Sequence, residues 1–360
     1  MVFRFNFFQK SAGSRPTRWK TLCGVLCTVG TFSAFGAPDH TPTPTHDGVP
    51  ASPESPASQT EDPPPPNPDS ESSWAPRLPI TVSFGLLPIA SGIFPGLGQW
   101  AYGEVADGAL YSGIALAAYR DHQMTEKRLR VGRSYRSLDS RDPTFRRYLM
   151  GRLLQQGVGG LSLYDSFRTA VIARQRDGYF AFYPRPDRVQ DILKAPFAFR
   201  HLARSSTAIP LAVGAALHLY AHRRLPEEPT RRRARLDRED LVYTSAVSYN
   251  AGTHEEAVFR GWLLPLLYEA SGHQWFANGV QALAFGLAHR NTIAFPLFQT
   301  LAGVYLGSLT IQDQYRLEQA VFLHTWWDVI AIAASFASRP KAGSLEGMAP
   351  WVLTPLHLVF

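Results

Sequence analysis

Two adjacent glutamates and an arginine stand in an apolar part of the chain, within the stretch THEEAVFRGW, residues 253–262. Glu256 and Arg260 are four residues apart, so on a helix they share one face in the order that favours an ion pair. Glu255 lies about 100° further round the same helix and can point elsewhere. Ionisable groups in apolar surroundings are costly, which makes them functional candidates. The stretch predicts one structural glutamate and one that is available for chemistry.

Two later apolar segments also carry polar side chains. The first ends in FGLAH, residues 285–289, and the second contains HTWWD, residues 324–328. His324 and Asp328 are four residues apart and share a helical face. Two histidines with carboxylates are a plausible set of ligands for a divalent metal, and imidazole favours zinc. A carboxylate beside such a metal, or beside a polarised water, can act as the general base in hydrolysis.

Each of these residues also has a structural interpretation. A single histidine in an apolar helix is more often a hydrogen-bonded core residue, and a Glu–Arg spacing is more often a structural ion pair. Asp328 could simply accept a hydrogen bond from His324 or Trp326. Three such groups on successive apolar segments are much less expected by chance, so their combination favours a catalytic site.

The order of the three motifs resembles that of the CPBP family, also called the Abi family. This family comprises the intramembrane CAAX proteases and the bacteriocin-processing enzymes. The resemblance covers roughly residues 241–338 and is carried by Glu255-Glu256-x-x-x-Arg260, Phe285-x-x-x-His289 and His324-x-x-x-Asp328. It implies a membrane endopeptidase whose site lies within the bilayer and opens toward the cytoplasmic face.

The resemblance also implies roles for the matching residues. Glu255 would be the principal catalytic glutamate, and His289 would act with it on the water. His324 and Asp328 would bind the metal, together with His289, or stabilise the oxyanion. The expected catalytic residues are Glu255, Glu256, His289, His324 and Asp328, supported by Arg260 and Phe285.

Asp328 departs from the pattern of the prenyl-protein processing branch, in which the third motif is often HxxxN. An asparagine can donate a hydrogen bond to an oxyanion, whereas an ionised aspartate cannot. The departure favours Asp328 as a metal ligand or as a residue that orients His324. It also weakens the expectation of CAAX substrates.

Charge and cysteine content restrict the remaining classes of function. The 360 residues have a net charge of +7, and the excess is mostly arginine between about residues 120 and 238. These arginines flank apolar segments, which favours cytoplasmic loops and lipid headgroups over nucleic acid. Cys23 and Cys27 both lie in the N-terminal apolar run. If that run is cleaved, a disulfide framework or a cysteine metal site is excluded.

The sequence divides into five parts. Residues 1–37 have the layout of a secretory signal or an uncleaved anchor. Residues 38–78 are rich in proline and predict a disordered linker. Residues 79–240 predict accessory membrane helices and basic loops, and residues 241–338 a catalytic membrane core. Residues 339–360 form a C-terminal apolar tail.

The predicted fold class is all-α, a polytopic transmembrane helix bundle of the bacterial inner membrane. Asp165 and Arg168, three residues apart, are expected to pair. We expect helices over residues 80–94, 109–119, 157–173, 206–221, 275–289, 293–312 and 318–338, and one or two helices over residues 241–270.

The predicted function is hydrolysis of peptide bonds in a membrane-associated protein or peptide, by a water that Glu255 activates. The expected partners are the lipid bilayer and a membrane-embedded substrate, with no nucleic acid. Two other classes stay open. One is a catalytically silent scaffold or immunity-type protein of the same fold, although every motif position here carries a reactive group. The other is a transporter that uses the carboxylates as a proton relay.

Overall fold

The structure is a computed structural model that describes residues 78–132, 142–224, 236–289 and 297–337. These residues form helices joined by turns and contain no strand, which confirms the predicted all-α class. The predicted signal or anchor, the C-terminal tail and all but the last residue of the predicted linker lie outside the described residues.

The helices before residue 225 are longer than predicted in the basic region. They are η2 (Val82–Leu86), α2 (Leu87–Ile93), α3 (Leu97–Ala101), α4 (Val105–Gly132), α5 (Pro143–Arg174), η4 (Gln175–Asp177), α6 (Val189–Lys194), η5 (Ala195–Phe197), η6 (Phe199–Ala203) and α7 (Ser205–Arg224). Asp142 explains the early start of α5, because its carboxylate accepts hydrogen bonds from the N–H groups of Thr144 and Phe145. Pro143 occupies the first turn, where proline is tolerated.

The second half agrees closely with the predicted helices. It contains α8 (Arg238–Glu256), η7 (Ala257–Leu263), α9 (Leu264–Ser271), α10 (Gln274–Ala288), α11 (Leu297–Gln312) and α12 (Glu318–Ala337). The predicted helix over 241–270 is continuous, but η7 is a π-helical stretch in its middle. Wide turns of this kind are frequently found at functional sites.

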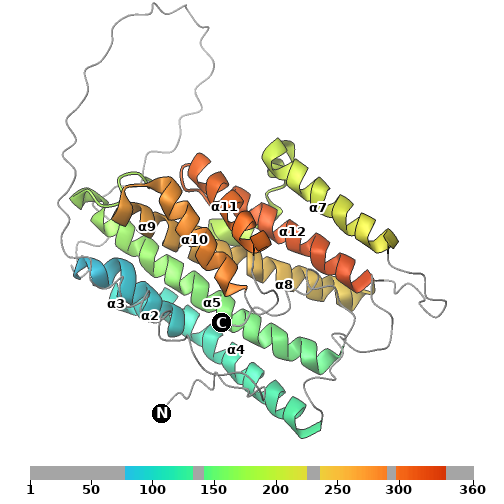
Figure 1. Ribbon diagram of the computed structural model, residues 1–360. Coiled ribbons are helices and arrows are strands. Elements are labelled where there is room, and N and C mark those ends of the chain that lie inside the picture. The colour runs from blue at the N-terminus through green and yellow to red at the C-terminus, as the bar shows by residue number, and fades with distance from the viewer. Residues whose placement is uncertain (1–77, 133–141, 225–235, 290–296, 338–360) are drawn as a thin grey trace, which may run out of the picture. The chain divides into compact units, whose positions relative to one another are not determined.

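Helix α5 is central to the bundle. It packs against α4 and α2 on one side and α8 on the other, and α12 packs against α8 and α7 (Figure 1). Glycines allow the close approach of α5 and α8. A Cβ atom at Gly157 would overlap the side chain of Asn250, and one at Gly160 would lie 3.1 Å from the Cβ of His254. The helix that carries the THEEAVFRGW stretch is therefore fixed along α5.

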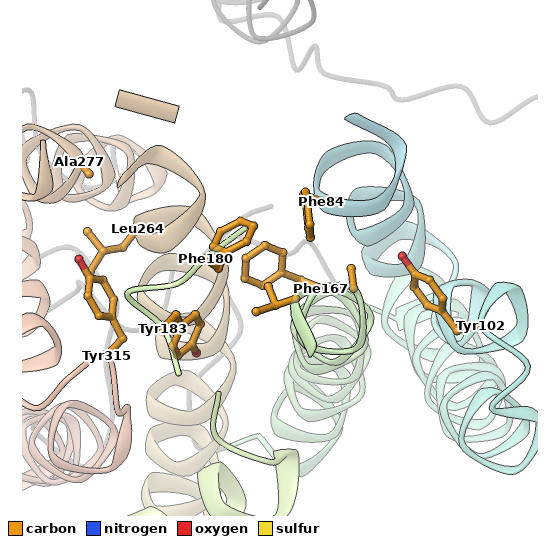
Figure 2. Packing of buried hydrophobic residues seen from close by; sticks show 10 residues of the cluster. Phe84, Tyr102, Phe167, Phe180, Tyr183, Leu264, Ala277 and Tyr315 are labelled. Atoms are coloured by element: carbon orange, nitrogen blue, oxygen red, sulfur yellow. The ribbon is translucent and has the colours of Figure 1, made fainter. Parts of the chain in front are cut away.

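An aromatic core fixes the segment after α5 against η2 and α9. Phe180 lies 4.8 Å from Phe84 and 5.3 Å from Phe167, measured between ring centroids, and both contacts are edge-to-face (Figure 2). Phe180 has a positive φ of 53°, and its N–H donates to the carboxylate of Glu269 at 3.0 Å. Such aromatic contacts contribute about 0.5–1.5 kcal/mol beyond area burial.

Asp187 connects the segment before α6 to the start of α12. Its carboxylate accepts a hydrogen bond from the N–H of Leu317 at 2.7 Å and lies 3.4 Å from Arg316. Burial raises the pKa of Asp187 above its ordinary value, although the Leu317 N–H and Arg316 oppose this. The contact fixes the N-terminal end of α12. His324 follows within two turns of that end.

Two expectations from the sequence need correction. None of the described helices is both long enough and apolar enough to span a membrane, contrary to the predicted transmembrane bundle. Asp165 and Arg168 also form no close ion pair in the described part of the chain, although the charge of Arg168 opposes the rise in the pKa of Asp165 that burial causes. Asp165 instead accepts hydrogen bonds from Gln99 at 3.3 Å and Tyr111 at 3.2 Å.

Candidate active site

All the residues predicted for the site come together where three parts of the chain meet. The end of α8 and η7 supply Glu255, Glu256 and Arg260, α10 and its C-cap supply Phe285 and His289, and α12 supplies His324 and Asp328.

Glu256 is the structural glutamate. Its Oε1 accepts a hydrogen bond from Arg260 Nη1 at 2.7 Å and another from His324 Nδ1 at 2.7 Å. Glu256 and Arg260 are both fully buried. A buried ion pair is stable only when its members are also hydrogen-bonded, as both are here. Glu256 therefore ties η7 to α12 and holds the His324 ring.

Glu255 is the available glutamate. Its side chain is 1 % exposed, and neither carboxylate oxygen has a hydrogen-bond partner in the described part of the chain. Its Oε2 lies 3.7 Å from His289 Nε2 and 3.8 Å from His324 Nε2. A buried carboxylate without partners is unusual in a folded protein and is typical of a reactive site.

The two histidines present the same ring atom to Glu255. His289 Nδ1 lies 2.8 Å from the carbonyl oxygen of Phe285, which can only accept, so this nitrogen must carry the hydrogen. In neutral His289 the lone pair then lies on Nε2. The Nδ1 of His324 donates to Glu256, so its Nε2 also faces Glu255.

Asp328 and Phe285 complete the surroundings of His324. Asp328 Oδ2 lies 3.6 Å from His324 Nε2. The Phe285 ring lies 4.6 Å from the His289 ring and 5.9 Å from the His324 ring, and the Arg260 guanidinium stacks 4.4 Å from its centroid. Phe285 therefore packs between the ion pair and both imidazoles, where it limits their movement.

Two amide residues of α10 belong to the same network and were missed in the sequence. The carbonyl of Gly303 accepts hydrogen bonds from Arg260 Nη2 at 3.2 Å and from Gln281 Nε2 at 3.0 Å, and Gln281 Nε2 lies 2.7 Å from Asn278 Oδ1. The signal was present, because residues 278, 281, 285 and 289 follow helical spacing and share one face of α10.

The predicted metal ligands do not form a ready site. His289, His324 and Asp328 have donor atoms that suit zinc. Within residues 78–132, 142–224, 236–289 and 297–337, however, no group of three or more histidine, cysteine, aspartate or glutamate side chains is arranged to hold a metal ion.

Comparison with known proteins covers the part of the chain that holds the site. No curated protein and no solved structure matches this chain. One family model, described as Rce1-like and as type II CAAX prenyl endopeptidase Rce1-like, matches residues 238–330. That range contains all three motifs, so the match supports the resemblance predicted from them. Over residues 238–330, this chain is similar to the Rce1-like type II CAAX prenyl endopeptidases.

Proposed function

We propose that this chain is an endopeptidase that hydrolyses a peptide bond of a membrane-associated protein or peptide. The observation that carries the proposal is the buried Glu255 carboxylate, which lies 3.7 and 3.8 Å from two histidine Nε2 atoms and has no hydrogen-bond partner in the described part of the chain. The family match over residues 238–330 supports a hydrolase of the protease type.

The geometry supports a water-activated reaction. A water between Glu255 and His289 donates one hydrogen to the Glu255 carboxylate and the other to the lone pair of His289 Nε2. As Glu255 takes the proton, the water oxygen bonds to the carbonyl carbon of the peptide, and the carbonyl π electrons move onto its oxygen. Collapse of this intermediate breaks the C–N bond, and Glu255 returns the proton to the leaving amine. Glu256 and Arg260 hold His324 in place throughout.

A membrane is the proposed partner of the bundle. Large apolar side chains are exposed on α7, α10 and α11, including Leu217 at 58 %, Phe276 at 61 % and Leu301 at 59 %. Exposed apolar surface of this extent is typical of contact with lipid or protein. The bacterial inner membrane and a divalent metal held by His289, His324 and Asp328 stay predictions.

The decisive experiment compares the wild-type chain with Glu255→Gln. The variant keeps the size of the side chain and removes the base, so we expect peptide cleavage to fall by about 10²–10⁴-fold. Comparative proteomics of membrane fractions should show uncut precursors that accumulate in the variant. Its thermal unfolding midpoint should stay near that of the wild type, because no described hydrogen bond of Glu255 is lost.

Glu239→Gln is the matched control, since it makes the same chemical change at an exposed position near the start of α8. It should leave the precursors unchanged. Full cleavage by Glu255→Gln would contradict the role of this residue. A wild-type chain that yields no cut product would instead favour the silent scaffold, and flux that follows a proton gradient would favour the transporter.

A further inference from the structure

The proposed hydrolysis needs a hydrogen-bond donor for the negative oxygen that forms on the peptide carbonyl. Three of the donors around Glu255 face acceptors, whereas the buried Arg260 Nε has no partner in the described part of the chain. Arg260 Nη1 and Nη2 face Glu256 and the Gly303 carbonyl, and His324 Nε2 faces two carboxylates. Asp328 stands where an amide side chain would be suited to this task, but an ionised aspartate cannot donate. Asp328 therefore leaves this task to another group, and a side-chain amide is suited to it.

Gln299 is a buried amide that the network around Glu256 does not use. It is 5 % exposed, its Oε1 has no hydrogen-bond partner, and its amide nitrogen makes no bond to the described residues. Two other buried glutamines donate hydrogen bonds, Gln281 to the Gly303 carbonyl and Gln319 to Ser206. An unpaired buried amide costs about 1–3 kcal/mol, which is typical of a group kept for a ligand.

The packing of α11 on α10 brings Gln299 to the level of the site. The two helices are antiparallel, because a Cβ at Gly303 would lie 3.0 Å from the Cα of Ala282, and one at Gly307 would overlap Asn278. The N-terminal end of α11 thus lies beside the C-terminal end of α10, which His289 follows (Figure 1). Gln299 is one turn before Gly303 on the same buried face.

The first turn of α11 also packs against α12. The ring of Phe298 lies 5.8 Å from the ring of Trp327, which stands between His324 and Asp328 in the sequence. Side chains on a helix lean toward its N-terminus. Gln299 therefore leans away from the contact between Gly303 and Arg260 and toward the level of His289.

We propose that Gln299 is a catalytic residue whose side-chain amide donates a hydrogen bond to the carbonyl oxygen of the scissile peptide bond. It would supply the donor that Asp328 cannot. The inference rests on the proposed peptidase function. The bond strengthens as negative charge develops on the oxygen, so it acts mainly on kcat and little on KM.

The test uses the purified full-length chain in detergent micelles with a mixture of internally quenched peptides of randomised sequence. Gln299→Leu should lower kcat by about 10²–10³-fold and leave KM within about two-fold of the wild type. Gln299→Glu keeps the size and loses the donor, so it should be similarly impaired and serves if the leucine variant does not fold. Thr310→Val is the control, because the buried Thr310 hydroxyl donates within α11 itself, to the Leu306 carbonyl at 3.1 Å.

A second substitution separates donation from packing. In the Gln299→Leu background, Asp328→Asn supplies a new amide donor and should recover kcat by about 10-fold or more. Wild-type kcat in Gln299→Leu, or the absence of any recovery in the double variant, would overturn the assignment and leave the peptidase function standing. A wild-type chain that cuts none of the peptides while Glu255→Gln behaves identically would overturn both.

Discussion

At the scale of single residues, Arg260 is the group on which the geometry of the site depends most. One of its terminal nitrogens binds the glutamate that holds His324, and the other binds a backbone carbonyl of α11. The guanidinium also stacks on Phe285. A planar group with several donors can make these contacts together, whereas a single ammonium cannot.

We therefore expect Arg260→Lys to destabilise the chain by about 1–3 kcal/mol, because Glu256 or the Gly303 carbonyl loses its partner. Cleavage should fall as well, since His324 is no longer held. The measurements are the thermal unfolding midpoint and peptide cleavage on the same preparation.

Arg200→Lys is the control for this substitution. Arg200 pairs with Glu318 at the surface and is 69 % exposed. Its replacement should therefore change neither the thermal unfolding midpoint nor peptide cleavage. An Arg260→Lys variant with both wild-type stability and wild-type cleavage would show that the contact with α11 is dispensable.

At the scale of the elements, the distance between α8 and α12 sets the position of His324 relative to Glu256. Gly252, one turn before Glu256, is a point of close approach between the two helices. A Cβ atom there would lie 2.9 Å from the backbone nitrogen of Thr325 and would overlap its hydroxyl. Backbone cannot yield as a flexible side chain can, so the helices would have to separate.

Gly252→Ala should therefore destabilise the chain by about 1–3 kcal/mol through overpacking and reduce cleavage by moving His324. Gly279→Ala on α10 is the control, because a Cβ at that position meets nothing within 4 Å. Replacing an exposed helical glycine by alanine is expected to raise the free energy of unfolding by about 0.5–1 kcal/mol. Equal unfolding midpoints for the two variants would contradict the close contact.

At the scale of the whole molecule, the exposed apolar surface of α7, α10 and α11 predicts how the chain partitions in a cell. We expect the full-length chain to sediment with membranes and to stay there after washing with high salt and with alkaline carbonate, because apolar contacts do not depend on salt. A mild detergent should release it. Immunoblots of the supernatant and pellet measure the distribution, and release by carbonate alone would contradict the proposed contact with lipid.

The sequence predicted the second half of the fold better than the first. The helices near 275–289, 293–312 and 318–338 begin and end close to the expected residues, because apolar residues predominate along them. In the basic region, the lengths of α4 and α5 were underestimated, since their charged residues mask the helical pattern. The cap at Asp142 and the glycine contacts that stabilise α5 depend on its neighbours in space.

For the site, the sequence by itself determined that Glu256, rather than Glu255, pairs with Arg260, because a spacing of four residues places the two on one face of any helix. It also determined which helices carry the polar groups. Only the tertiary structure decided that both histidines turn Nε2 toward Glu255, and that Gln281 and the Gly303 carbonyl anchor Arg260. The reason is physical: helical periodicity is local, whereas these contacts depend on how α8, α10, α11 and α12 pack.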